Sequence, residues 1–158
     1  MRAWVTDINW YNPPMSLDFR FHIAMQGALG IGGNLTKYGL KDLACAKKNI
    51  ELYKEIRHLV QFGDLYRILD PEKDEILFNH YVSEDKTEAM FTIVSKLFVR
   101  EESLFVKLKG LDPDLYYKCE DNGEVYSGAL LMYAGLNLTF DFKTWDGNSL
   151  ALHFEATE

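Results

Sequence analysis

The spacing of apolar and polar residues changes near Gly63 and divides the chain into two parts. Before Gly63, short apolar runs alternate with stretches in which apolar residues recur every three or four positions, the period of an amphipathic helix. After Gly63, β-prone runs are separated by turn-forming residues, which is the pattern of successive strands. The pattern therefore predicts a mixed first domain, residues 1–63, and a strand-rich second domain, residues 64–158.

The first domain is predicted to contain two successive β-α units. Residues 2–8 form a short β-prone run, which ends at a Pro-Pro pair because proline cannot join a strand ladder. A helix is expected over residues 17–28, with Ser16 as its N-cap, and a short buried strand over residues 29–35. Consecutive β-α units usually lie side by side in a parallel sheet that is covered by the helices.

The helix expected over residues 40–62 has the clearest pattern in the chain. One apolar stripe runs along it, formed by Leu43, Ala46, Ile50, Tyr53, Ile56, Leu59 and Val60. Gly63 is expected to end the helix in the left-handed conformation that glycine adopts easily. The chain then restarts at Asp64 as the first strand of the second domain.

The second domain is predicted to be an antiparallel β-sandwich. Its strand-like runs recur at roughly 8 to 12 residue spacing, with a helical turn near residues 128–133. Asp121-Asn122-Gly123 is a strong hairpin signal. The predicted fold class is therefore α+β, with two β-α units followed by the sandwich.

Composition and charge narrow the range of functions. Apolar residues make up 47% of the 158 residues, which is enough for a sizeable core, and the net charge of −7 does not favour nucleic acid or anionic lipid as partners. No apolar run approaches the length of a membrane span and no signal peptide is recognised, so the expected location is the cytoplasm. Cys45 and Cys119 are expected to be free thiols.

The residues offer little sign of a cofactor or metal site. Gly30-Ile31-Gly32-Gly33 lacks the third glycine of a dinucleotide fingerprint, and no Gly-Lys-Ser or Gly-Lys-Thr sequence follows to make a phosphate loop. The four histidines, His22, His58, His80 and His153, have no local metal-binding spacing, and we expect His22 and His58 to be polar positions on helices. No cofactor, metal or catalytic nucleophile is therefore predicted.

The loop after the first strand has the best pattern for contacting a substrate. In "TDINWYNPP", the polar residues Asp7 and Asn9 stand beside the aromatic ring of Trp10, with Tyr11 and Asn12 following. Loops at the carboxyl end of a parallel strand carry the active sites of barrel enzymes. Polar groups beside aromatic rings suit a sugar, although an ordinary loop with a buried tryptophan fits the same residues.

Longer stretches carry a family resemblance. The segments "IELYKEIRHLVQFGDLYRIL", "LKGLDPDLYYK" and "YSGALLMYAGL" occur in this order. The chain resembles, over nearly its whole length, the C-terminal part of bacterial-type α-galactosidases of glycoside hydrolase family 36. The resemblance implies that residues 1–63 are the last two units of a (β/α)8 barrel and that residues 64–158 are the C-terminal β-domain.

The resemblance also implies a reaction. The family hydrolyses terminal α-linked galactose, as in melibiose and raffinose, with retention of configuration by two aspartates. These aspartates lie in "KWD"-type and "SD"-type motifs, which do not occur here and would precede Met1. We therefore expect the chain to be inactive alone and to bind galactosides only when joined to the rest of a barrel. We also expect it to form homo-oligomers or to associate through exposed barrel edges.

Two other functions fit parts of the sequence. A free-standing carbohydrate-binding sandwich would need coplanar exposed rings, for which Tyr116, Tyr117, Tyr126 and Trp145 are candidates. Tyr116 and Tyr117 are adjacent and must face opposite sides of a strand, which weakens this alternative. A protein-interaction domain would rest on the helix over residues 40–62, whose apolar stripe already has a use inside the fold.

Overall fold

The computed structural model describes residues 2–6, 15–70, 72–73, 76–95, 103–139 and 148–157. The first part of the chain forms β1 (Arg2–Val5), α1 (Leu17–Ala24), β2 (Ala28–Ile31), a 3-10 turn (Leu35–Lys37) and α2 (Leu40–Phe62). The second part forms β3 (Asp64–Arg67), β4 (Ile76–Val82), β5 (Glu88–Ser95), β6 (Ser103–Val106), β7 (Tyr116–Cys119), β8 (Val125–Ser127), a π-helical turn (Leu130–Ala134), β9 (Leu136–Thr139) and β10 (Asn148–Thr157).

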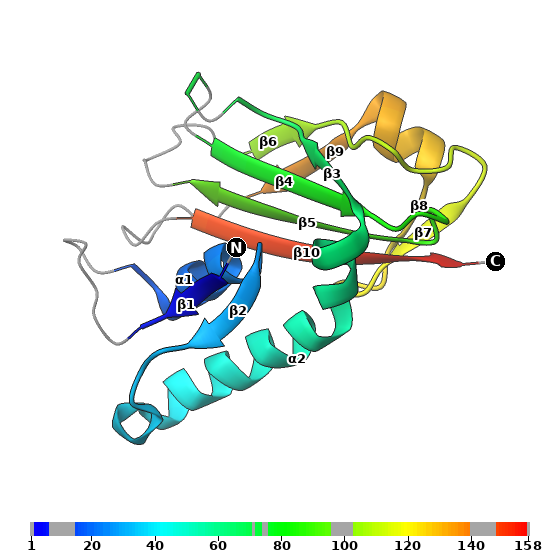
Figure 1. Ribbon diagram of the computed structural model, residues 1–158. Coiled ribbons are helices and arrows are strands. Elements are labelled where there is room, and N and C mark those ends of the chain that lie inside the picture. Colours follow the sequence, from blue (N-terminus) through cyan, green and yellow to red (C-terminus); the bar gives the residue numbers. More distant parts are fainter. Residues whose placement is uncertain are drawn as a thin grey trace.

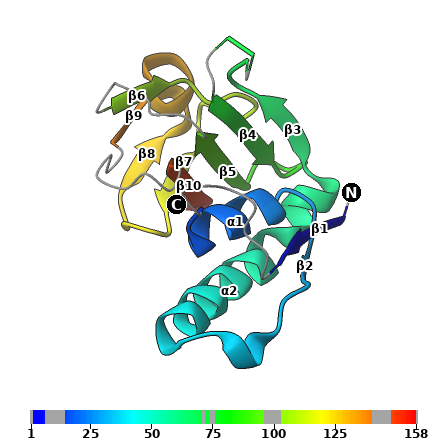
Figure 2. The same ribbon diagram turned by 90° about the vertical axis from the view of Figure 1, so that its left-hand side faces the viewer.

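A six-stranded sheet in the order β3-β4-β5-β10-β7-β8 is the centre of the fold, and all its strand pairs are antiparallel. The helices lie on one side of this sheet, and the antiparallel pair β6-β9 lies on the other side (Figures 1 and 2). β1 and β2 form a separate parallel pair beside α1 (Figure 1). The antiparallel architecture expected for the second part of the chain is confirmed.

Both faces of the central sheet are buried. On the face toward β6 and β9, the rings of Phe78, Phe91 and Phe154 form the middle of the largest core cluster. The ring centroids of Phe78 and Phe91 are 5.1 Å apart, and those of Phe91 and Phe154 are 5.7 Å apart. These spacings are typical of favourable edge-on and tilted aromatic pairs.

The opposite face of the sheet packs against the helices. Met25, Ile56 and Leu59 come from the helical part of the chain, and they contact a cluster formed with Tyr81, Met90 and Ala151 on β4, β5 and β10. Side chains alternate between the two faces of a strand, so the nearly continuous burial along β4 and β5 shows that both faces of the sheet are covered. The residues on either side of Gly63 therefore share one core.

Most element positions follow the sequence pattern. α2 spans the predicted residues 40–62, and Ser16 caps α1 by accepting a hydrogen bond at 3.1 Å from the backbone N–H of Phe19. α1 ends at Ala24 rather than near residue 28, because a turn at residues 25–27 leads directly into β2. A buried strand was expected over residues 29–35; β2 instead spans Ala28–Ile31 and is exposed to half-buried, and among the described residues only β1 pairs with it.

Gly63 ends α2 by a different means from the one predicted. Its backbone is extended, with φ −74° and ψ 162°, so the expected left-handed conformation is wrong. The next residue, Asp64, already pairs with Val82 in the sheet. A Cβ at residue 63 would lie 2.7 Å from the carbonyl oxygens of both Leu59 and Val82. Glycine is required because two backbone segments leave no room for a side chain.

Replacing Gly63 with alanine should therefore destabilise the fold. The expected loss is about 1–3 kcal/mol of unfolding free energy, the usual cost of overpacking against groups that cannot move aside. Urea unfolding of Gly63→Ala against the wild-type chain measures it. Gly30→Ala is the matched control, because its Cβ would meet Trp4 at an ordinary 3.6 Å. Equal losses for both variants would contradict the steric explanation.

Candidate functional site

The carboxyl ends of β1 and β2 lie next to each other. The two strands pair in parallel from Arg2 with Ala28 to Val5 with Ile31, and the N–H of Gly32 donates to the Val5 carbonyl at 2.9 Å. The loop predicted to contact a sugar begins directly after β1. Its residues Asp7, Asn9 and Trp10, together with Tyr11 and Asn12, lie outside the described residues, so their role stays a prediction.

The glycine-rich segment makes room for the indole of Trp4. A Cβ at Gly32 would lie 2.8 Å from Cε3 of Trp4, and a Cβ at Gly30 would lie 3.6 Å from the same ring. The glycines therefore permit a large aromatic ring to lie over β2. Trp4 remains 58% exposed, although tryptophan side chains are on average well buried in folded proteins.

This end of the molecule leaves apolar surface uncovered. Within the described ranges, neither β1 nor β2 pairs with a second strand. Leu40 is 88% exposed and Leu43 is 41% exposed, whereas Ala46, Ile56 and Leu59 further along α2 are buried. The predicted stripe is therefore buried over only part of its length, since Leu43 near its start stays partly exposed. Open strand edges and exposed apolar side chains are typical of a surface that another chain segment covers.

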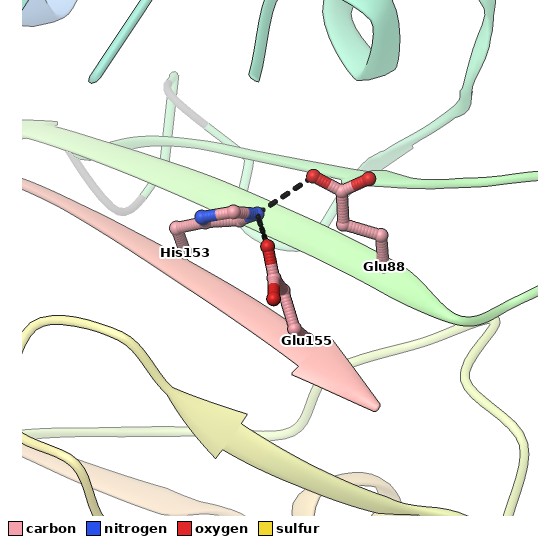
Figure 3. A group of neighbouring side chains, drawn as sticks. All are labelled: Glu88, His153 and Glu155. Atoms are coloured by element: carbon pink, nitrogen blue, oxygen red, sulfur yellow. Dashed lines mark hydrogen bonds and ion pairs between the residues drawn. The ribbon is translucent and has the colours of Figure 1, made fainter. Parts of the chain in front are cut away.

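A group of histidines and glutamates forms a second place of chemical interest, where α2 meets the sheet. The Nε2 atom of His153 lies 2.7 Å from Oε1 of Glu88 and 4.0 Å from Oε1 of Glu155 (Figure 3). The other oxygen of Glu88, Oε2, lies 2.6 Å from Nε2 of His58. Two strands and a helix therefore direct four titratable side chains to one point.

The sheet register brings this group together. β5 and β10 are antiparallel, with Glu88 opposite Glu155 and Met90 opposite His153. Residues two apart on a strand share a face, so all three side chains stand on the helical face of the sheet. The ligand atoms of Glu88, His153 and Glu155 all lie within 4.8 Å of one another, a group that could hold a metal ion. Local spacing gave no sign of it, because residues 88 and 153 are far apart in sequence.

The two carboxylates are not placed for glycoside hydrolysis. A retaining glycosidase needs two carboxyl groups about 5 Å apart with the sugar between them. Glu88 and Glu155 approach such a separation, but both carboxylates lie against the Nε2 atom of His153 (Figure 3). A surface pocket of ≈ 520 Å³ opens nearby, lined by His58, Leu59, Phe62, Gly63, Ser83, Glu84 and Asp85.

His22 and the two cysteines, the other candidate groups, show no sign of being activated for chemistry. His22 lies on α1 as expected, with Nδ1 2.8 Å from the Ser149 hydroxyl, and burial lowers the pKa of this imidazole to about 4. Cys45 and Cys119 are free thiols, as predicted. Burial, reinforced by the Asp18 carboxylate, raises the pKa of the Cys45 thiol to about 11, so it is not an activated nucleophile.

The described rings do not form the coplanar aromatic platform that the carbohydrate-binding alternative would need. Tyr116 is 54% exposed but Tyr117 is fully buried, as expected for neighbours on a strand, and the Tyr117 hydroxyl donates to the Lys86 carbonyl at 2.7 Å. Tyr126 is half-buried and packs near Phe154. Trp145 falls outside the part of the chain that the structure describes.

His80 should make stability depend on pH. It is buried beside Tyr66, and burial lowers the pKa of its imidazole to about 3. The unfolded chain takes up a proton near pH 6.5 while the folded chain does not, so stability falls as the pH drops from 6.5 toward 3. Between pH 6.5 and 5, the unfolding free energy of the wild-type chain should fall by about 2 kcal/mol more than that of His80→Gln. Urea unfolding at both pH values measures the difference, and parallel losses would contradict it.

Comparison with known proteins shows which proteins this chain is similar to. Residues 79–154 match the glycosyl hydrolase family 36 C-terminal domain. The chain is 37% identical over 126 residues to α-galactosidase AgaA of Geobacillus stearothermophilus, covering 79% of this chain and 17% of that protein. It is 36% identical over 126 residues to α-galactosidase C of Emericella nidulans, covering 79% of this chain and 16% of that protein.

Solved structures agree with these sequence matches. The crystal structure of the family 36 α-galactosidase AgaB from Geobacillus stearothermophilus superposes with a TM-score of 0.89 at 33% identity, over 99% of this chain and 22% of that one. The structure of AgaA from the same organism gives a TM-score of 0.86 at 31% identity, over 99% of this chain and 21% of that one. The chain thus spans about a fifth of the length of these relatives.

Proposed function

This chain belongs to glycoside hydrolase family 36, and we propose that it acts as the C-terminal part of an α-galactosidase rather than as an enzyme by itself. In this proposal, the complete enzyme hydrolyses terminal α-linked galactose with retention of configuration. The present chain contributes the last two barrel strands and the β-domain. The cytoplasmic location and the formation of oligomers remain predictions. None of the described helices is long and apolar enough to cross a membrane.

The observation that carries the proposal is the open parallel pair β1-β2 with its helices. A closed barrel of this class has eight parallel strands, each followed by a helix. β1 precedes α1 and β2 precedes α2, the order of two such units. In the proposal, the strands of the other six β-α units would pair with the outer edges of β1 and β2, and these units would cover Trp4, Leu40 and Leu43.

The position of the catalytic groups follows from this arrangement. Retaining hydrolysis needs one nucleophilic carboxylate and one acid/base carboxyl group about 5 Å apart. In the proposal, both come from other strands of the barrel. The loop after β1 would contribute Asp7, Asn9 and Trp10 to the sugar site, at the barrel face where substrates bind.

The six-stranded sheet would brace the end of the barrel. Ile56 and Leu59 of α2 are buried against the sheet, and the Tyr53 hydroxyl donates to the Gly27 carbonyl at 2.8 Å while accepting from the Leu29 N–H at 3.2 Å. These contacts link α2 both to the β-domain and to the start of β2. The orientation of the last barrel strand would thus depend on the sheet.

We expect the pure chain not to hydrolyse p-nitrophenyl α-galactoside, since two barrel strands do not form a closed catalytic site. A chimera tests whether the chain can act as the C-terminal part of an α-galactosidase. In it, this chain replaces the matched C-terminal segment of AgaA from Geobacillus stearothermophilus. The chimera should hydrolyse the substrate, and the same chimera cut after residue 63 should lose at least tenfold in kcat/KM.

Two outcomes would contradict the proposal. One is turnover by a homogeneous preparation of the chain alone. The other is a chimera that unfolds cooperatively on heating, and is therefore folded, but shows no hydrolysis above that of AgaA without its C-terminal segment.

Sugar binding by the isolated chain should also be absent. Calorimetric titration with galactose and with raffinose should give no saturable heat, because Tyr117 is buried and leaves Tyr116 without a coplanar neighbour on its strand. A saturable one-to-one isotherm that Tyr116→Ala abolishes would instead support the carbohydrate-binding module.

A further inference from the structure

We propose that Glu88, His153 and Glu155 bind a divalent transition-metal ion of the zinc type, with His58 holding the carboxylate of Glu88 in place. This site is separate from the sugar chemistry proposed above. It lies where β5, β10 and α2 meet, and it would act as a structural cross-link.

The backbone already sets the spacing that such a site requires. Glu88 and Glu155 are directly opposite each other in the β5-β10 pair, and His153 is two residues before Glu155 on the same face. Zinc bonds to nitrogen and oxygen of about 2.0–2.2 Å place tetrahedral ligand atoms roughly 3.3–3.6 Å apart. The Nε2 to oxygen distances of 2.7 Å to Glu88 and 4.0 Å to Glu155 lie on either side of this range.

Small side-chain rotations would reach coordination geometry. The Glu155 side chain is 57% exposed and free to turn toward the Nε2 atom of His153. The His153 side chain is 4% exposed and held within the sheet, which makes it the fixed ligand. Three protein ligands leave a fourth position for water, and no backbone movement is needed.

The surrounding charge also favours a cation. Glu88, whose side chain is 20% exposed, and Glu155 place two carboxylates near one imidazole. Lys118 faces Glu155 across the β7-β10 pair, but its ammonium group is bound to Glu120 at 2.9 Å. Asp121 adds another carboxylate, whose Oδ2 accepts a hydrogen bond at 3.4 Å from the backbone N–H of His153. A bound dication would neutralise this excess of negative charge.

The donor atoms select the kind of metal. Imidazole nitrogen suits zinc, copper and nickel, whereas calcium prefers six to eight oxygen ligands. Ligating carboxylates are commonly held by a second hydrogen bond, and the 2.6 Å contact between His58 and Glu88 has that form. Through His58, a bound ion would connect α2 to β5 and β10.

The competing explanation is a metal-free hydrogen-bonded group in which the histidines alone offset the carboxylates. Zinc titration of the chelator-treated chain separates the two. We expect one zinc ion to bind per chain with a dissociation constant of micromolar or below, and the thermal unfolding midpoint to rise with zinc.

Glu155→Gln is the informative variant, because an exposed side chain can be changed without disturbing the core. It should weaken zinc binding at least tenfold. Glu84→Gln is the matched control, because Glu84 is an exposed acid that lines the pocket beside His58 and lies outside the ligand set, and this variant should retain wild-type affinity. His22→Gln, also outside the site, should retain it too.

Three results would overturn the proposal: no saturable zinc binding, equal affinities for Glu155→Gln and Glu84→Gln, or a dependence on His22. The measurement uses the chain alone and no galactoside. Its outcome is therefore distinguishable from failure or success of the α-galactosidase proposal.

Discussion

The pairing of β10 with its neighbours is the interaction on which the rest of the structure depends. β10 contains the last described residues of the chain, yet it lies between β5 and β7 in the middle of the six-stranded sheet. Eight residue pairs join it to β5 and four join it to β7. The sheet therefore depends on its last strand, since without β10 the strands β3-β4-β5 and β7-β8 would have no shared partner.

This strand also connects the two faces of the sheet. Phe154 completes the aromatic cluster toward β6 and β9, while Ala151 and His153 face the helices. Because consecutive side chains point to opposite faces, one strand in one register serves both cores. A shift of one residue would move His153 into the aromatic cluster and Phe154 toward Glu88.

The same constraint explains why α2 stops so abruptly. The helix has to remain on the sheet through Ile56 and Leu59, and the chain has to join the sheet edge at once through Asp64 and Val82. Both requirements meet at residue 63, where backbone oxygens occupy the space of a side chain. The junction is thus a packed joint between α2 and the sheet, and it brings His58 of α2 within reach of Glu88.

The sequence by itself determined the helices, most strands, the hairpin at residues 121–123 and the family. These features depend on periodicity, capping and turn chemistry between near neighbours. Only the tertiary structure decided the burial of β2, the exposure of Leu43, the extended backbone of Gly63 and the meeting of Glu88 with His153. Each of these depends on which distant segment lies alongside, because register and packing act between residues that have no regular separation in the sequence.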